Sequence, residues 1–312
     1  MMSSAKNPFQ WMYEEAARGN NASKYAELPE YPTHIDVELT STCNFRCRMC
    51  PVGNLSLDRP AGFMSWETFD RIVEQCASQV IGLRFVGWGE PMMHPQVFRF
   101  LRRATDALLP THLNTNGSKI GDYEQQMLIN MGLDSIKFSL QGSTRETYAE
   151  MRSIDFYDDL FNAVRKFHRR RGVHPKPFIS VSTTVTDEHP STIEVFKRKF
   201  SPFCDQLSVG HTTFDFMDDV PEDLAARQTV EKKHFNPCPE VFDKLAISFD
   251  GTARVCCNDF NGTTNLGNIN QFDLKDIWKE MTIVSYRKRL SEEDYTMPLC
   301  NSCFDYMKLT DG

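Results

Sequence analysis

Cysteine is the residue type that carries most of the chemical information in this chain. Ten cysteines occur among 312 residues, too few for a disulfide scaffold of this length, and seven of them are clustered. In a reducing compartment, clustered cysteines more often bind metal or carry out redox chemistry than form disulfides. The sequence therefore predicts metal or redox sites at these clusters. Their members are Cys43, Cys47 and Cys50, then Cys256 and Cys257, and then Cys300 and Cys303.

The first cluster has the spacing Cys-x3-Cys-x2-Cys and directly follows a predicted strand. A structural zinc site closes with four ligands, whereas only three cysteines are local here. Iron–sulfur clusters bind thiolates, typically four, so three thiolates on a four-iron cluster would leave one iron open to an exogenous ligand. A redox pair, or a zinc site completed by a distant residue, is the alternative interpretation.

Three further segments lie where predicted strands end. Glycines in the first of them would let the backbone approach a ligand closely, and Glu90 can accept a hydrogen bond from an ammonium group. A plain turn between strand and loop is the alternative for that segment. The three segments are Gly87-Trp88-Gly89-Glu90-Pro91, Asn114-Thr115-Asn116-Gly117 and Ser139-Leu140-Gln141-Gly142.

Together, these residues resemble the radical S-adenosylmethionine (radical SAM) enzymes. Cys43, Cys47 and Cys50 match the signature of that family, and the strand-end segments follow in the family's order. The resemblance implies that the three cysteines hold a 4Fe–4S cluster whose open iron binds the amino and carboxylate groups of SAM. One electron from the cluster would then cleave SAM to a 5′-deoxyadenosyl radical, which removes a hydrogen atom from a substrate C–H bond.

The resemblance also implies SAM-binding roles for residues near the strand ends. Met49 stands where the family often has an aromatic residue near the adenine. Ser139 would face SAM, and Arg152 would pair with its carboxylate through the planar guanidinium. Gln141 replaces an aspartate that is often found at its position. The implied SAM-binding residues are Met49, Gly87, Gly89, Glu90, Asn114, Ser139 and Arg152.

A second cysteine set lies in the C-terminal region and resembles the first part of the SPASM/twitch extension of radical SAM enzymes. Its pattern is Cys238-x12-Gly251-x4-Cys256, then Cys300-x2-Cys303, and no cysteine follows. The resemblance implies that these four thiolates close one auxiliary 4Fe–4S cluster, which would serve as an electron carrier or a fold staple. From the spacing alone, a four-cysteine zinc knuckle is the alternative.

Cys257 is left over beside Cys256. A buried structural thiol is the usual fate of a free cysteine. The alternative is that Cys257 donates a hydrogen atom to a substrate radical, as a thiol near the auxiliary cluster does in some related epimerases. Cys76 falls at an apolar position of a predicted helix, so we expect it in the core.

The elements that position these residues alternate between short β-rich runs and helical patterns. Repeated βα units imply a parallel sheet with right-handed crossovers. Six units are too few for a closed eight-stranded barrel, so we expect an α/β fold with a partial (β/α)6 TIM-like barrel. The predicted strands are His34–Leu39, Ile81–Val86, Thr111–Leu113, Ser135–Leu140, Phe178–Val185 and Cys204–Val209. Helices are predicted from Ser65 as the cap and near Gln96–Leu108, Thr144–Met151 and Asp158–Arg171.

The C-terminal part differs in kind from the repeated units. Asp250-Gly251 between two β-rich runs is a strong hairpin signal, and a helical stretch is predicted over Asp273–Met281. We therefore expect a small auxiliary domain made of a β-hairpin and helices. The predicted divisions are an N-terminal extension (1–33), the barrel (34–210), a solvated linker (211–234) and the auxiliary domain (235–312).

Composition limits the classes of function. The chain has 35 Lys+Arg and 42 Asp+Glu, a net charge of −7, and 40% hydrophobic residues, as is ordinary for a globular protein. Mild acidity argues against nucleic acid as a partner, because phosphate binding needs a basic face. The chain has no apolar run of the ~18 residues that a membrane span needs, and no apolar signal core at its N-terminus. We expect a cytoplasmic protein.

The favoured hypothesis is a radical SAM enzyme that carries out a two-electron oxidation (dehydrogenation) of a sugar or aminocyclitol. A flavodoxin- or ferredoxin-type protein would supply the electrons. One alternative is a radical epimerase of a sugar or peptide with Cys257 as hydrogen donor, and another is a different peptide maturase. The short segment before the first strand favours a small polyol over a peptide. An alternative from another class is a non-enzymatic, zinc-stapled interaction protein.

Overall fold

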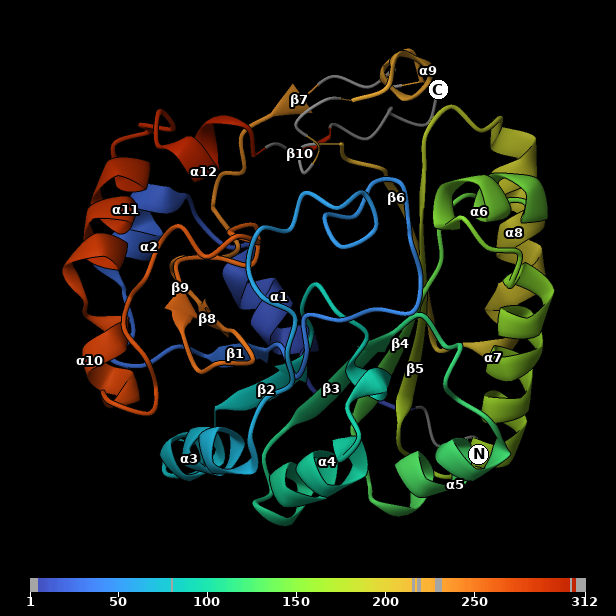
Figure 1. The fold of residues 1–312 in the computed structure, drawn as a ribbon, viewed down its shortest axis with the longest axis horizontal. Coiled ribbons are helices and arrows are strands. Elements are labelled where there is room, and N and C mark those ends of the chain that lie inside the picture. The colour runs from blue at the N-terminus through green and yellow to red at the C-terminus, as the bar shows by residue number, and fades with distance from the viewer. Residues whose placement is uncertain are drawn as a thin grey trace.

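The fold is built on one sheet of eight strands, flanked by helices (Figure 1). The computed structural model describes residues 5–79, 81–214, 217, 220–227, 232–303 and 305–306. The strands lie in the order β6-β5-β4-β3-β2-β1-β8-β9, and the first six follow one another in parallel. They are β1 (His34–Val37), β2 (Gly82–Phe85), β3 (Thr111–Thr115), β4 (Ser135–Ser139), β5 (Phe178–Val185), β6 (Gln206–His211), β8 (Lys244–Ile247) and β9 (Ala253–Arg254).

Helices cover the outer face of the six parallel strands, as a partial (β/α)6 TIM-like barrel requires (Figure 1). This confirms the predicted α/β fold class. The covering helices are α3 (Trp66–Ala77), α4 (Val97–Asp106), α5 (Asp122–Asn130), α6 (Arg145–Arg152), α7 (Tyr157–Arg171) and α8 (Pro190–Phe200). Two short 3-10 turns, η1 (Pro91–Met93) and η2 (Ser201–Phe203), lie between them along the chain.

Helix α3 forms as its sequence predicts. The Ser65 side chain caps it by accepting a hydrogen bond from the Thr68 amide at 3.1 Å. Its apolar positions recur at the helical spacing and are buried against the sheet, so packing of this face stabilises the helix. Cys76 belongs to that face and is fully buried, which confirms its expected place in the core.

The C-terminal part joins the same sheet, which the sequence did not predict. The expected hairpin is present as β8 and β9, with Gly251 in its turn at φ +87°, where glycine is favoured. However, β8 also pairs in parallel with β1, residue for residue from His34 with Lys244 to Val37 with Ile247. The predicted Asp273–Met281 helix is shorter, and the helices there are α10 (Leu274–Trp278), α11 (Met281–Ser291) and α12 (Pro298–Asn301).

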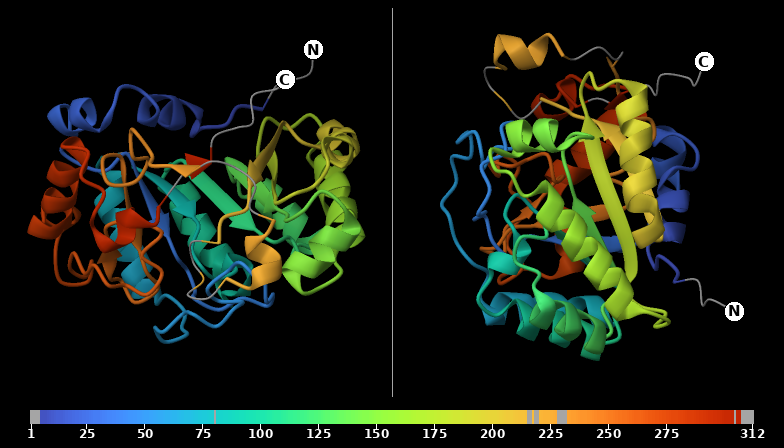
Figure 2. Two further views of the ribbon diagram at one scale, coloured as in Figure 1. Left: turned by 90° about the horizontal axis from the view of Figure 1, so that it is seen from above. Right: turned by 90° about the vertical axis from the view of Figure 1, so that its right-hand side faces the viewer.

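The N-terminal extension closes one end of the barrel. Helices α1 (Gln10–Ala16) and α2 (Asn21–Ala26) lie across one side of the molecule, and α2 packs beside α11 (Figure 2). Phe9 is buried and its ring contacts the rings of His34 and His112 edge-on. Asn21 accepts a hydrogen bond from the Cys238 amide at 2.5 Å, so the extension also binds the C-terminal part.

The predicted linker is only partly described, because residues 215, 216, 218, 219 and 228–231 lie outside the described residues. Within it, α9 (Glu222–Ala225) forms, and β7 (Lys232–Lys233) pairs antiparallel with β10 (Asp305–Tyr306). The division of the chain into extension, barrel, linker and auxiliary domain stays a prediction. No helix in the described part of the chain has both the length and the apolar character needed to cross a membrane.

Candidate active site

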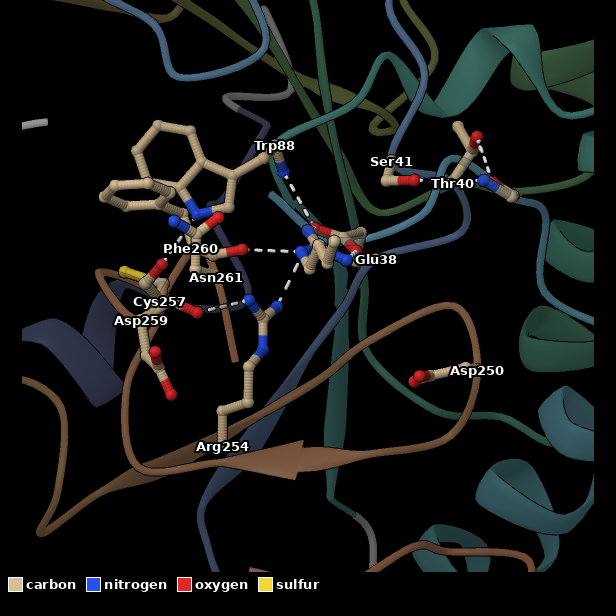
Figure 3. Close-up of polar contacts among 12 residues, drawn as sticks. Glu38, Thr40, Ser41, Trp88, Asp250, Arg254, Cys257, Asp259, Phe260 and Asn261 are labelled. Atoms are coloured by element: carbon tan, nitrogen blue, oxygen red, sulfur yellow. Dashed lines mark hydrogen bonds and ion pairs between the residues drawn. The ribbon is translucent and has the colours of Figure 1, made fainter. Parts of the chain in front are cut away.

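The first three cysteines lie together on the loop that leaves β1. Side chains at the start of this loop fix its path: Thr40 Oγ1 donates to the Gly62 carbonyl at 2.6 Å, and Ser41 Oγ accepts from the Gly62 amide at 3.0 Å (Figure 3). Further along, the Cys50 amide donates to the Cys47 carbonyl at 3.2 Å. The loop therefore holds its cysteines within a compact turn.

Two hydrogen-bond donors approach the sulfur atoms of this loop. Asn116 Nδ2 lies 3.8 Å from Cys43 Sγ, and Arg152 Nη1 lies 3.6 Å from Cys47 Sγ. Burial raises the pKa of Cys43 to about 11 and also raises the pKa of Cys50, so both thiols stay protonated until a metal displaces the protons. Donors to sulfur are typical of iron–sulfur sites, where they tune the cluster. These residues fit a 4Fe–4S cluster.

Glu90 lies beside this loop, with a buried carboxylate that is 3% exposed. Its Oε1 accepts from Thr115 Oγ1 at 2.8 Å and from the Met92 amide at 3.1 Å, and its Oε2 accepts from the Asn116 amide at 2.7 Å. Burial raises the pKa of Glu90. The hydrogen bonds fix the carboxylate in one orientation, and Oε2 keeps an acceptor position for an ammonium group.

Replacement of Glu90 by glutamine should weaken SAM binding about tenfold or more, because an amide does not offer the charge that an ammonium group prefers. Glutamine keeps the shape of the side chain and one of its acceptor oxygens. The measurement is anaerobic calorimetry of SAM binding to the reconstituted protein, with the exposed Glu74→Gln as the matched control. Equal affinity in Glu90→Gln and the parent protein would remove Glu90 from the SAM site.

The two glycines before Glu90 have a packing role in the structure. A Cβ on Gly89 would lie 2.1 Å from the Thr40 carbonyl oxygen and 2.6 Å from that of Thr42, and one on Gly87 would lie 2.5 Å from Glu38 Cγ. The backbone after β2 thus closely approaches the loop after β1. The absence of side chains at these glycines lets the ends of β1 and β2 pack together. Contact of the glycines with a ligand stays a prediction.

The remaining predicted SAM-binding residues converge from three segments. Ser139 Oγ donates to Asn114 Oδ1 at 2.7 Å, and Arg152 Nη2 donates to the Ser139 carbonyl at 2.8 Å. The Nε of Arg152 is buried and has no hydrogen-bond partner within the described residues. Met49 packs against a small apolar cluster that includes Met151. The structure thus brings together an apolar wall and a guanidinium with an unused donor.

Sequence reasoning missed some residues of this site. Thr115 and Asn116 hold Glu90, and their only signal was their place at a strand end. Gln141, which replaces an aspartate, instead ties two neighbouring strand ends: its Oε1 accepts from Thr184 Oγ1 at 2.7 Å, and its Nε2 donates to Thr212. The two hydrogen bonds therefore give Gln141 a structural role at this position.

The second cysteine set surrounds a small cavity of about 130 Å³. Cys238, Cys300 and Cys303 line it, and Asn258 Nδ2 donates to Cys303 Sγ at 3.3 Å. Burial raises the pKa of Cys238 to about 11 and those of Cys300 and Cys303 to about 12. Cys256 is close enough to Cys238 for the two thiols to influence each other, and burial raises its pKa as well.

These groups are not arranged around a single ion. Within the described residues, no three His, Cys, Asp or Glu side chains are gathered closely enough to hold one metal ion. A tetrahedral zinc site would need four ligand atoms within about 2.3 Å of one point. A cavity between the thiols, together with a donor to sulfur, suits a multinuclear cluster better. We propose Cys238, Cys256, Cys300 and Cys303 as its ligands.

A larger cavity of about 360 Å³ lies where the end of β2 meets the C-terminal part. The end of β2 contributes Gly87 and Trp88 to its wall, and the C-terminal part contributes Cys257, Asn258 and Cys303. Trp88 Nε1 donates to the Cys257 carbonyl at 2.7 Å and so joins the two parts (Figure 3). Burial raises the pKa of Cys257, so its thiol is protonated. Cys257 thus lines a cavity and is not a core residue.

Comparison with known proteins gives the family. The model of the Radical SAM superfamily matches residues 37–200, which is more than half of the chain. The chain belongs to the radical SAM superfamily. The SPASM model, described as an iron-sulfur cluster-binding domain, matches residues 238–304. These families imply SAM and 4Fe–4S clusters as the cofactors of this radical SAM protein, and they agree with iron–sulfur over zinc.

Curated relatives match the chain over most of its length at low identity. One is the tungsten-containing aldehyde ferredoxin oxidoreductase cofactor-modifying protein of Pyrococcus furiosus, which is 23% identical over 89% of this chain and 90% of its own. Another is the S-adenosyl-L-methionine-dependent 2-deoxy-scyllo-inosamine dehydrogenase of Niallia circulans, which is 23% identical over 86% of this chain and 91% of its own.

Solved structures share the fold of this radical SAM protein. BtrN in complex with AdoMet and 2-DOIA superimposes with a TM-score of 0.59, at 18% identity over 87% of this chain and 92% of that one. Streptococcus suis SuiB bound to S-adenosylmethionine has a TM-score of 0.69, at 14% identity over 89% of this chain and 73% of that one. At such identities the likeness concerns the fold.

Proposed function

We propose that this radical SAM enzyme carries out a two-electron oxidation, the dehydrogenation of a sugar or related polyol. The observation that carries the proposal is the 360 Å³ cavity, whose wall combines the strand end before Glu90 with residues of the second cysteine set. Its volume lies in the range of small-molecule sites. A substrate in this cavity would therefore lie beside Cys303 of the second set and next to the strand end that leads to Glu90.

The proposed roles follow from the contacts of each residue. Cys43, Cys47 and Cys50 would hold the first cluster, and Glu90 would accept the ammonium group of SAM. Arg152, fixed by the Ser139 carbonyl, would bind the SAM carboxylate through its unused Nε. When bound, the cofactors supply the radical that removes a hydrogen atom from the substrate carbon. They also supply an acceptor for the electron that the substrate then loses together with its hydroxyl proton.

Relatives support a small polyol as the substrate. The Niallia circulans relative is named as a 2-deoxy-scyllo-inosamine dehydrogenase, and BtrN was solved with 2-DOIA and AdoMet. A flavodoxin- or ferredoxin-type protein would supply the reducing electron. We also propose a cytoplasmic location, where reductants of this kind and a reducing environment for the thiols are present.

Epimerisation is a second candidate, and one observation favours it. Cys257 presents a protonated thiol to the cavity, and a protonated thiol can return a hydrogen atom to a substrate radical. The substrate would then end at the same oxidation level with inverted configuration. Oxidation would leave Cys257 without a chemical role.

Product analysis in D2O separates the two reactions. For the oxidation, we expect a ketone without solvent deuterium at the reacting carbon, and Cys257→Ala should keep product formation within about threefold. The assay offers sugars, aminocyclitols and peptides to reduced protein and detects products by mass spectrometry. Cys204→Ala, a half-buried thiol away from the cavity, is the matched control. An epimer that carries deuterium, and that Cys257→Ala abolishes, would overturn the oxidation and establish the second candidate.

A further inference from the structure

The inner face of the barrel next to the cavity is charged. Barrel interiors of this kind are usually filled by branched apolar side chains. Here, five cationic and three carboxylate side chains among the described residues make up what we call the inner wall: ion pairs link all of them except Lys137, and Asp36 and Arg254 line the cavity. The cations are Arg59, Arg84, Lys137, Lys244 and Arg254, and the carboxylates are Asp36, Glu38 and Glu240.

The carboxylates are shared between four of the cations. Asp36 lies 3.4 Å from both Arg84 Nε and Lys244 Nζ, and Lys244 also contacts Glu240 at 2.6 Å. Although burial opposes the charged form of Asp36, its two cationic neighbours hold its pKa at about 2. The carboxylate of Asp36 is thus ionised and already neutralised by its partners.

Glu38 is shared in the same way, near Trp88 and Arg254 (Figure 3). Its Oε2 lies 2.5 Å from Arg59 Nη2 and 3.7 Å from Arg254 Nη2. Arg254 lines the cavity, is 2% exposed, and has a buried Nε with no hydrogen-bond partner within the described residues. Arg254 contacts Asp259 through its backbone carbonyl, and the Asp259 carboxylate accepts hydrogen bonds from Thr263 and Thr264.

Lys137 is the cation without a carboxylate partner in the described part of the wall. It lies on β4 between Asn114 of β3 and Ser180 of β5. Burial, and then the charge of Arg84, lowers its pKa to about 8, while Asp36 and Cys257 act in the opposite direction. Since Leu113 pairs with Phe85, the register sets Lys137, opposite Asn114, level with Val86, which lines the cavity. A desolvated cation in this position needs a negative charge beside it.

We propose that the substrate carries a carboxylate or phosphate group, which binds beside the cavity to Lys137 of β4, with the cavity-lining Arg254 as a second cationic contact. This inference rests on the proposed function and names the class of its substrate: an acidic sugar or polyol. The anionic group would anchor one end of the substrate against the wall, and the reacting carbon would face the SAM site. A neutral polyol would leave Lys137 without a counter-charge from the substrate.

The test measures anion binding to the cluster-loaded protein without requiring turnover. Inorganic phosphate and D-glucuronate are titrated at constant ionic strength, with D-glucose as the neutral probe, and the thermal unfolding midpoint is followed. We expect saturable stabilisation by one or both anions and none by glucose. If only one anion stabilises the protein, it identifies the anionic group of the substrate as phosphate or carboxylate; if both do, either group is accepted. In Lys137→Met, the apparent dissociation constant should rise about tenfold or more, since one charged hydrogen bond is lost.

Two further variants complete the design. Lys137→Arg keeps the charge and should restore most of the anion response, and the exposed Lys288→Met should respond as the parent does. Equal responses of Lys137→Met and the parent, or no saturable response to either anion, would overturn the inference. A changed auxiliary-cluster potential in Lys137→Met with an unchanged anion response would also overturn it, by showing that the surplus charge balances the cluster. Dithionite-driven SAM cleavage by the parent tests the proposed function separately.

Discussion

Replacement of Cys47 by alanine is expected to reduce 5′-deoxyadenosine formation about 1,000-fold or more, because a cluster that loses a thiolate is no longer held with an open iron. Cys47 is the buried cysteine of the first loop, and Arg152 lies 3.6 Å from its sulfur. The substitution therefore removes both a ligand and the contact that links the loop to Arg152. No other cysteine in the described chain belongs to this loop apart from Cys43 and Cys50.

The measurement is chromatographic detection of 5′-deoxyadenosine after dithionite reduction, together with iron analysis. The parent should contain about eight iron atoms per chain and the variant about four, if each site holds a 4Fe–4S cluster. Cys76→Ala is the matched control, since Cys76 is fully buried in the core and distant from the loop. A Cys47→Ala protein with full iron content and cleavage would show that Cys47 is not a ligand.

Loss of the second cluster should reduce product formation but leave SAM cleavage largely unchanged, unlike loss of the first cluster. We expect Cys300→Ala to lower formation of oxidised product about 100-fold while SAM cleavage stays within about threefold, because the first site is built from a separate loop. Cys300 lines the 130 Å³ cavity with Cys238 and Cys303. Iron content should fall from about eight to about four atoms per chain, as for Cys47→Ala, so iron analysis and the cleavage assay together separate the two sites.

Stability needs its own readout, because a cluster held by these four cysteines would also join segments of the fold. The unfolding midpoint of Cys300→Ala and of the more conservative Cys303→Ser is compared with that of Cys204→Ala, in which a thiol outside the cavity is removed. If both cluster variants remain folded yet keep full product formation, the second site has no part in the oxidation. If they also keep their iron, these cysteines are not ligands.

Local patterns predicted the barrel well. The six parallel strands were recognised because each is a short β-rich run between helical patterns, and the helix after Ser65 because its cap and apolar spacing agree. The Asp250-Gly251 turn likewise marked the hairpin, since a turn of this kind is a local property. The cysteine spacings predicted where thiols would gather for the same reason.

Long-range contacts could not be predicted from local patterns. The pairing of β8 with β1 joins residues about two hundred positions apart, and nothing in either segment names its partner. The donors to sulfur, Asn116 and Asn258, come from segments distant from the cysteines that they contact. The packing of Gly89 could not be predicted either, because the atoms that a Cβ there would meet belong to Thr40 and Thr42 on another loop.

The charged inner wall also could not be predicted from the sequence. Asp36, Arg84, Lys137 and Lys244 each sit in a different strand, and each would be read alone as a polar residue on an alternating pattern. Only the order and register of the paired strands bring them to one face. Conflicts of this kind between local expectation and global fold are most common at functional sites.

The parallel pairing of β8 with β1 has a consequence for the integrity of the molecule. Because backbone hydrogen bonds link the two segments, the C-terminal part is not an appendage that can detach while the barrel stays intact. A chain truncated before Lys244 would leave β1 as an unpaired edge strand. Exposed edge strands pair with other chains and so promote aggregation. The two halves are therefore expected to melt in a single cooperative transition, and the spacing between their cofactors is set by the sheet itself.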